Sequence, residues 1–89
     1  MKVIFDEKAL AQYMEWQMQD RKTLKKINEL LKDILRNGAE SGIGQPEPLK
    51  YALTGFWSRR IDKENRLIYK ISENGDLNII SCKGHYEDK

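Results

Sequence analysis

The stretch Arg21-Lys22-Thr23-Leu24-Lys25-Lys26-Ile27-Asn28-Glu29-Leu30-Leu31-Lys32-Asp33-Ile34-Leu35-Arg36 predicts the longest element of the fold. Its apolar side chains follow the i, i+3, i+4, i+7 spacing of one helix face, at Leu24, Ile27, Leu30, Leu31, Ile34 and Leu35. The basic side chains lie mainly on the other face. Asp20 is a suitable N-cap, and Gly38 can take the left-handed conformation that ends a helix. We therefore expect one amphipathic helix over about residues 21–36.

The residues before this helix predict a strand and a second helix. Lys2-Val3-Ile4-Phe5 has the composition of a short strand, and Asp6 is a suitable N-cap for a helix over about residues 7–19. The apolar face of that helix is expected to hold Leu10, Tyr13 and Met14, together with Trp16. The link to the next helix is so short that the two helices must form an antiparallel hairpin.

The residues after the hairpin predict a loop and three strands. Residues 39–48 form the loop, in which Pro46 and Pro48 stiffen the backbone around Glu47. The strands are expected at residues 56–62, 65–71 and 77–83, and Asn74-Gly75 predicts a tight turn between the last two. The order β-α-α-β-β-β predicts a single α+β domain over residues 1–89, with an N-terminal helical hairpin packed on a mostly antiparallel sheet.

Side-chain alternation along the strands predicts which residues face the helices. Trp57 and Tyr69 belong to the more apolar face, which the helices should cover. Arg60 and Arg66 then point to the open face. Together with the Glu47 loop and His85, this face is expected to form a concave surface suited to an anion.

Composition limits the class of protein. The chain has 89 residues and a net charge of +2, with 39% hydrophobic and 34% charged residues, which is typical of one small globular domain. No apolar run approaches the ~18–20 residues that cross a bilayer, so no membrane association is expected. The single Cys82 excludes an internal disulfide and fits a reducing, cytoplasmic environment.

The C-terminal half carries the side chains that can cleave a phosphodiester without a metal. It offers Glu47 as a carboxylate, several arginines, Lys50, and His85, the one histidine of the chain. Such cleavage needs a base, an acid and cations that hold the phosphate. Taken singly, each of these residues is more often merely solvated. Cys82 and His85 have zinc-like spacing, but two ligands do not make a self-contained structural zinc site.

Two further groups of residues have open interpretations. The basic side chains Lys22, Lys25 and Lys26 are either an ordinary solvated helix face or a contact for nucleic-acid phosphates. Phe56 or Tyr86 could stack on a base.

Taken together, the residues resemble the YoeB toxins of bacterial type II toxin–antitoxin systems, within the RelE-like superfamily. The resemblance covers essentially the whole chain and runs through five segments: Lys25-Lys26-Ile27-Asn28-Glu29-Leu30, Pro46-Glu47-Pro48-Leu49-Lys50, Gly55-Phe56-Trp57-Ser58-Arg59-Arg60-Ile61, Arg66-Leu67-Ile68-Tyr69 and Cys82–Tyr86. It implies a RelE-like, microbial-ribonuclease-like fold.

The resemblance also implies a site and an activity. The activity is that of a ribosome-dependent endoribonuclease that cuts mRNA in the 30S A site without a cofactor or metal and thereby inhibits translation. The implied catalytic residues are Glu47 as base, His85 as acid, Arg66 as stabiliser of the phosphate charge, and Tyr86, which orients the substrate. The implied substrate-binding residues are Lys50, Arg60, Arg59 and Phe56, and the implied ribosome or RNA-phosphate contacts are Lys22, Lys25 and Lys26.

The resemblance implies partners as well. They are a YefM-like antitoxin, the ribosome with its mRNA, and operator DNA bound through the antitoxin complex, and a homodimer is a further expected assembly. The alternative function is a non-catalytic, toxin-like transcriptional co-regulator. An intact set of Glu47, Arg66, His85 and Tyr86 favours catalysis, because a binding module needs no acid–base pair.

The chain departs from the family pattern at two places. Residues Glu87-Asp88-Lys89 extend past Tyr86, where the family typically stops, and they bring two carboxylates near an expected anion site. Gly84 stands where a bulkier residue usually precedes the histidine, and it is expected to give His85 additional backbone freedom.

Overall fold

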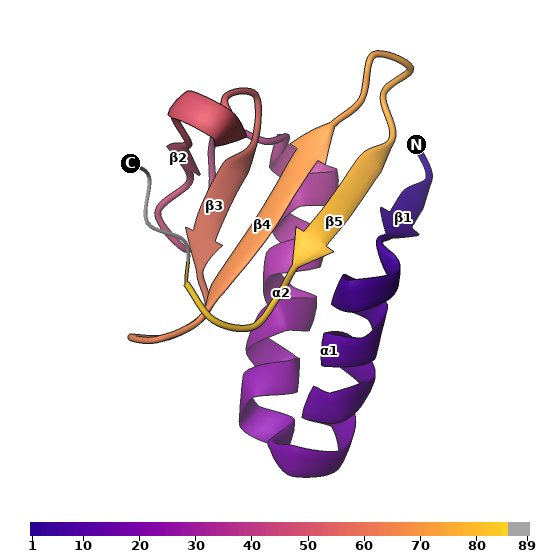
Figure 1. The fold of residues 1–89 in the computed structure, drawn as a ribbon, viewed down its shortest axis with the longest axis vertical. Helices are drawn as coiled ribbons and strands as arrows, with labels where there is room; N and C mark the ends of the chain where they lie inside the picture. Colours follow the sequence, from indigo (N-terminus) through magenta and orange to yellow (C-terminus); the bar gives the residue numbers. More distant parts are fainter. Residues whose placement is uncertain (86–89) are drawn as a thin grey trace.

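The computed structural model describes residues 1–85, and residues 86–89 lie outside the described part. The elements follow one another as β1 (Val3–Phe5), α1 (Glu7–Gln19), α2 (Arg21–Asn37), β2 (Glu47–Pro48), the 3-10 turn η1 (Tyr51–Leu53), β3 (Trp57–Arg60), β4 (Arg66–Ile71) and β5 (Leu77–Ser81) (Figure 1). Two helices pack on one five-stranded sheet, which confirms the predicted fold class. Within residues 1–85, no helix is long and apolar enough to span a bilayer.

The sheet is mixed, with the order β1-β5-β4-β3-β2. β1 runs parallel to β5, and all other neighbours are antiparallel, so the expectation of a mostly antiparallel sheet is confirmed. The order places the first strand of the chain beside the last. A register shift interrupts the β4–β5 ladder at Ile68 and Tyr69.

The hairpin of helices forms as the sequence predicts. The side chain of Asp20 accepts hydrogen bonds from the backbone N–H groups of Lys22 and Thr23, which are among the unpaired donors of the first turn of α2. Gly38 ends α2 with a φ of 87°. Ile27, Leu30 and Ile34 are completely buried, as the periodicity predicts, whereas Leu35 remains 47% exposed.

The predicted apolar face of α1 is partly wrong. Leu10 and Met14 are 46% and 56% exposed, while Ala9 is completely buried and Trp16 nearly so. The small Ala9 side chain leaves room for close approach to Cys82, whose Sγ lies 3.7 Å from the Ala9 carbonyl oxygen. Asp6 occupies the N-cap position of α1, but its side chain makes no capping hydrogen bond.

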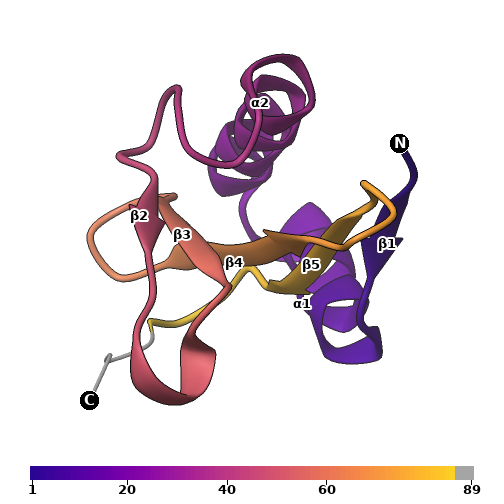
Figure 2. The ribbon, with the colours of Figure 1, turned by 90° about the horizontal axis from the view of Figure 1, so that it is seen from above.

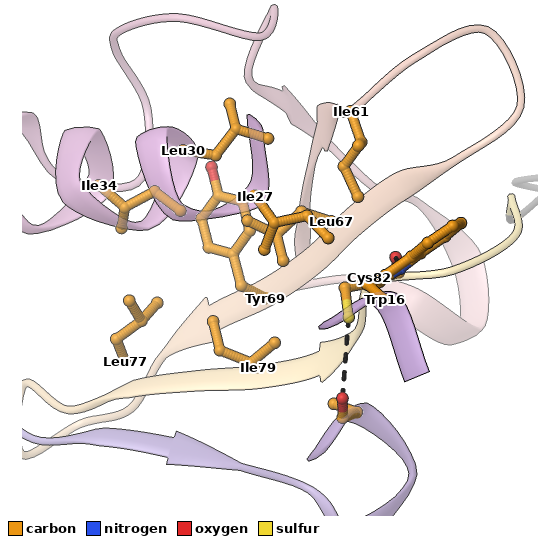
Figure 3. Close-up of a cluster of buried hydrophobic side chains, with 11 residues drawn as sticks. Trp16, Ile27, Leu30, Ile34, Ile61, Leu67, Tyr69, Leu77, Ile79 and Cys82 are labelled. Carbon is orange, nitrogen blue, oxygen red and sulfur yellow. Dashed lines mark hydrogen bonds between the residues drawn. The ribbon is translucent and has the colours of Figure 1, made fainter. Parts of the chain in front are cut away.

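The core lies between the helices and the sheet (Figure 3). It combines residues of α1, of α2 and of the helix-facing side of β4 and β5, with Ile61 and Cys82 from the segments that follow β3 and β5: Ala9, Trp16, Ile27, Leu30, Ile34, Ile61, Leu67, Tyr69, Leu77, Ile79 and Cys82. Tyr69 is completely buried, as predicted, whereas Trp57 is only half-buried.

The region between α2 and β3 contains structure that the sequence did not indicate. Residues 47–48, expected in a loop, form the edge strand β2, in which Glu47 pairs with Ser58 and Pro48 pairs with Trp57. Proline has no N–H to donate and is tolerated at a sheet edge.

β3 and β5 are also shorter than predicted. The tight turn at Asn74-Gly75 is present, and the Gly75 N–H donates to the carbonyl of Ser72 over 2.8 Å.

Candidate active site

Strand register brings a carboxylate and two arginines to one face of the sheet. Glu47 pairs with Ser58, and Arg60 pairs with Arg66. Directly paired residues point to the same face, as do residues two apart on one strand. Glu47, Ser58, Arg60 and Arg66 therefore share a face. In Figure 2, α2 lies on one side of the sheet, and η1 and the chain after β5 lie on the other.

The residues of this face differ in exposure. Glu47 and Arg60 are exposed, Arg66 is half-buried, and Ser58 is 7% exposed. The guanidinium of Arg66 is folded onto the β3–β4 turn, where Nη1 donates to the carbonyl of Asp62 over 2.7 Å and to that of Asn65 over 3.1 Å. These bonds use Nη1 alone, so they orient the Arg66 guanidinium without engaging its Nε and Nη2 donors.

His85 reaches this region on the segment after β5, residues 82–85, which we term the C-terminal arm. The backbone N–H of Arg66 donates to the carbonyl of Gly84 over 2.8 Å, so the residue before His85 lies directly against the start of β4. His85 itself is exposed. Tyr86, expected beside it, lies outside the described residues. The arm thus carries the histidine to the same end of β4 that holds Arg66.

Arg59 does not belong to this site, and its predicted contact with substrate is wrong. Its side chain is completely buried on the helix-facing side, where Nε donates to the Tyr69 hydroxyl over 2.9 Å and Nη1 pairs with Asp33. The same guanidinium donates to three loop carbonyls at 2.8–3.0 Å, those of Gly38, Ser41 and Ile43. A fully buried arginine with these partners offers no surface to a substrate.

The Arg59 network shapes the loop that leads to Glu47. Asp33 also accepts the Ile43 N–H over 3.0 Å, and the Arg59 hydrogen bond holds the pKa of that carboxyl below its usual value. A Cβ added at Gly42 would lie 1.7 Å from an Asp33 carboxylate oxygen, so the loop passes too close for any side chain there. Beyond this point, the carbonyl of Gly44 accepts the Arg60 N–H over 2.7 Å. This bond holds the loop against β3 just before β2 begins.

Phe56 and Lys50 border the open face. Lys50 is exposed and precedes η1, and Phe56 is half-buried. The Nζ atom of Lys70 lies 4.9 Å from the centre of the Phe56 ring, a cation–π contact. Sequence reasoning left Lys70 out of the site, although its alternation with Arg66 and Ile68 in β4 could have indicated it. Lys70 adds a cation to the same face.

The basic residues of α2 are not brought together with this face. Lys22 and Lys25 are exposed and Lys26 is half-buried, on the helix that covers the opposite side of the sheet (Figure 2). Lys25 lines a groove of about 660 Å³ with Arg21 and Lys32. If these lysines bind phosphates, they form a surface separate from Glu47 and Arg66.

Two further observations concern the Cys82 thiol and possible metal ligands. Burial raises the pKa of the Cys82 thiol to about 11, so it is protonated at neutral pH. Within residues 1–85, no three histidine, cysteine or acidic side chains are grouped as ligands for a metal ion. The open face itself presents the Glu47 carboxylate beside the cations of Arg60, Arg66 and Lys70.

Comparison with known proteins identifies the family. The family described as "YoeB-like toxin of bacterial type II toxin-antitoxin system" matches residues 5–86. The chain belongs to this family. It is 49% identical to Toxin YoeB of Escherichia coli K12 over 97% of this chain and 100% of that toxin. It is 51% identical to Toxin YoeB of Synechocystis over 98% of this chain and 99% of that toxin.

Solved structures agree with this assignment. A YoeB/ParE toxin from Agrobacterium tumefaciens superposes with a TM-score of 0.92 at 38% identity, covering 97% of this chain and 100% of that one. YoeB in a heterotetrameric YoeB-YefM complex from Staphylococcus aureus superposes with a TM-score of 0.88 at 51% identity, covering 97% and 98% of the two chains. The recognised family and the RelE-like fold class are confirmed, and the chain is a type II toxin of the YoeB family.

Proposed function

We propose that this toxin is a ribosome-dependent mRNA endoribonuclease that cleaves in the A site by metal-independent acid–base catalysis. One observation carries the proposal. The β2–β3–β4 register gathers Glu47, Arg60 and Arg66 on one face, and the Arg66–Gly84 hydrogen bond brings the His85 segment to the same end of β4. Membership of the YoeB family supports the choice of RNA as substrate.

Each residue of the proposed site has a separate role in the reaction. Glu47 takes the proton from the RNA 2′-hydroxyl, whose oxygen attacks the adjacent phosphorus. The bond to the 5′-oxygen breaks, and His85 gives that oxygen a proton, which leaves a 2′,3′-cyclic phosphate and a free 5′-hydroxyl. Arg66, with Arg60 and Lys50, stabilises the charge that develops on the phosphate oxygens. Tyr86 orients the substrate, and Phe56 with Lys70 lines its path.

Single-turnover cleavage of a programmed ribosome tests these roles. We expect His85→Gln and Glu47→Gln each to lower the cleavage rate by about 10²–10⁴, because each removes one positioned proton-transfer group. Glu64→Gln is the matched control, since Glu64 is an exposed carboxylate in the β3–β4 turn, and it should cleave at the wild-type rate. The upstream product should end in a cyclic phosphate.

If the wild-type protein binds ribosomes but does not cut mRNA, the proposed activity is refuted and the alternative function, a non-catalytic co-regulator, is favoured. Wild-type cleavage with an unaffected His85→Gln variant would instead transfer the acid role to Tyr86 or to a ribosomal group. Substitution of Lys22, Lys25 or Lys26 should weaken ribosome binding and its salt dependence without changing cleavage once bound.

The proposed function includes partners. A YefM-like antitoxin should bind this toxin, since the Staphylococcus aureus relative forms a YoeB-YefM complex, and together they should bind operator DNA as co-repressor. A YoeB from Staphylococcus aureus has also been solved as a dimer, which supports a homodimer here. Action on ribosomes implies a cytoplasmic location. Co-expression of the antitoxin should restore growth, and the complex should co-elute in gel filtration. Separate elution at micromolar concentration would refute the pairing.

A further inference from the structure

The C-terminal arm is fastened to α1 where it leaves β5. The backbone N–H of Cys82 donates to Gln12 Oε1 over 2.7 Å, and the Cys82 carbonyl accepts from Trp16 Nε1 over 2.9 Å. The next residue, Lys83, forms an ion pair with Glu15. Both polar backbone groups of Cys82 are thus satisfied by α1, and the start of the arm is fixed.

The far end of the arm is held differently. Gly84 has a φ of 81°, and a Cβ added there would meet no atom within 4 Å, so packing does not hold this residue. Two hydrogen bonds do. Gly84 donates its N–H to Asn65 Oδ1 and accepts the Arg66 N–H at its carbonyl, each over 2.8 Å. Gly84 was expected to have additional backbone freedom. In the structure it adopts a left-handed conformation, and both its N–H and its carbonyl are hydrogen-bonded.

Asn65 is itself rigidly placed. Its amide Nδ2 donates to both carboxylate oxygens of Asp62 over 3.1 Å, and its backbone N–H donates to Asp62 Oδ1 over 2.7 Å. Because Asp62 occupies the donor side of the amide, the acceptor Oδ1 is turned toward Gly84. The other bond to Gly84 comes from the backbone of Arg66, so among the described residues Asn65 supplies the side chain that holds this end of the arm.

We propose that Asn65 is a positioning residue for His85. Its Oδ1 fixes the N–H of Gly84, one residue before the imidazole, and so determines where the acid stands relative to Glu47 and Arg66. The inference rests on the proposed function, in which His85 protonates the leaving oxygen. A reacting group displaced by about 1 Å can lose about 10² in rate, which is the size of effect expected when this bond is removed.

Single-turnover cleavage and ribosome affinity, measured separately, test the proposal. Asn65→Ala should cleave about 10²-fold more slowly with an unchanged Kd for ribosomes. Asn74→Ala is the matched control, because Asn74 makes a comparable side-chain hydrogen bond in the turn at the other end of β4 and should cleave normally. If Asn65→Ala melts below the assay temperature, Asn65→Ser replaces it. Serine is still favoured in turns but is too short to reach Gly84.

A double-mutant cycle separates positioning from a general structural role. If Asn65 acts through His85, then adding Asn65→Ala to His85→Gln should not lower the residual rate further. A purely structural effect would lower the rate by the same factor in both backgrounds and would refute the proposal. Hydrogen exchange at the Gly84 amide gives a readout that does not depend on activity, and Asn65→Ala should accelerate it whereas Asn74→Ala should not.

The outcomes distinguish this inference from the function on which it rests. A wild-type protein that does not cleave refutes the proposed function, and the positioning role with it. Wild-type cleavage, impaired by His85→Gln but unaffected by Asn65→Ala, refutes the positioning role alone. An unchanged Gly84 exchange rate in Asn65→Ala would show that the hydrogen bond does not hold the arm in solution.

Discussion

Replacing Arg59 by methionine should remove a large part of the stability of this protein, whereas replacing its neighbour Arg60 should change the stability very little. Methionine fills much of the same space but donates no hydrogen bond. The change therefore removes the partner of Asp33 and leaves the carbonyls of Gly38, Ser41 and Ile43 without their donor. Breaking a buried ion pair by removing one partner typically costs about 3–5 kcal/mol. A domain of this size has a total stability of about 4–13 kcal/mol.

Urea unfolding followed by tryptophan fluorescence measures the difference. With a slope of about 1.5 kcal/mol per M, the Arg59→Met midpoint should fall by about 2–3 M. Arg60→Met changes an exposed side chain and should stay within about 0.5 kcal/mol, or about 0.3 M. Midpoints of the two variants that agree within about 0.5 M would refute the reasoning, because the buried network would then contribute no more than a surface residue.

The pH dependence of this difference follows from Asp33. Its carboxyl has a lowered pKa in the folded protein because of the hydrogen bond from Arg59. A lowered folded-state pKa contributes stability above the unfolded pKa of about 3.9, and this contribution is lost as the pH falls through the folded pKa. The difference in free energy of unfolding between wild type and Arg59→Met should thus be largest at neutral pH and should decrease below about pH 4. A gap that widens in acid would contradict this assignment.

Three smaller effects can be checked by thermal or urea denaturation. Asp20→Ala should cost about 1 kcal/mol because it removes the N-cap of α2, whereas Asp6→Ala, at a cap position without a side-chain hydrogen bond, should cost clearly less. Tyr69→Phe should cost about 1–2 kcal/mol, since the hydroxyl donates to the Ala39 carbonyl over 2.7 Å and accepts from a buried guanidinium, and an unchanged midpoint would argue against that bond. Gly42→Ala should destabilise more than Gly55→Ala, because both have positive φ but only the former would place a Cβ against a carboxylate.

The elements that local pattern controls could be predicted from the sequence. The spacing of Ile27, Leu30 and Ile34 predicted the buried face of α2, and Asp20 and Gly38 predicted its ends. These signals lie within one or two helical turns, so no distant residue has to be known. The strands β3, β4 and β5 were found for the same reason, although their ends were set too wide.

The errors arose where distant residues decide. Arg59 was predicted to bind substrate, although its alternation with Arg60 puts it on the helix-facing side. A buried cation needs a partner, and that partner, Asp33, lies 26 positions earlier in the chain. β2 is only two residues long and exists through its pairing with Ser58 and Trp57. In α1, Leu10 and Met14 were assigned to the buried face because they are apolar and suitably spaced, but they are exposed. Spacing does not reveal that Cys82 approaches the helix closely at Ala9, where only a small side chain fits.

The site was predicted in part. The open-face location of Arg60 and Arg66 follows from alternation alone, and the register agrees with it. The fastening of the arm was not predictable, because Gln12, Trp16 and Asn65 contact it through single polar atoms across long sequence separations. The roles of Glu47 and His85 stay predictions until cleavage is measured.

The parallel pairing of β1 with β5 has a consequence for synthesis on the ribosome. Val3 pairs with Leu77, so β1 cannot pair in the sheet until a residue 74 positions later in the chain has been translated. At about 5–20 residues per second, that delay is about 4–15 s. During this interval the helical hairpin has neither Leu77 nor Ile79 to cover its apolar face. Products that terminate early, before β5, should accordingly be recognised by chaperones and proteases as unfolded chains, so that prematurely ended translation yields little persistent protein.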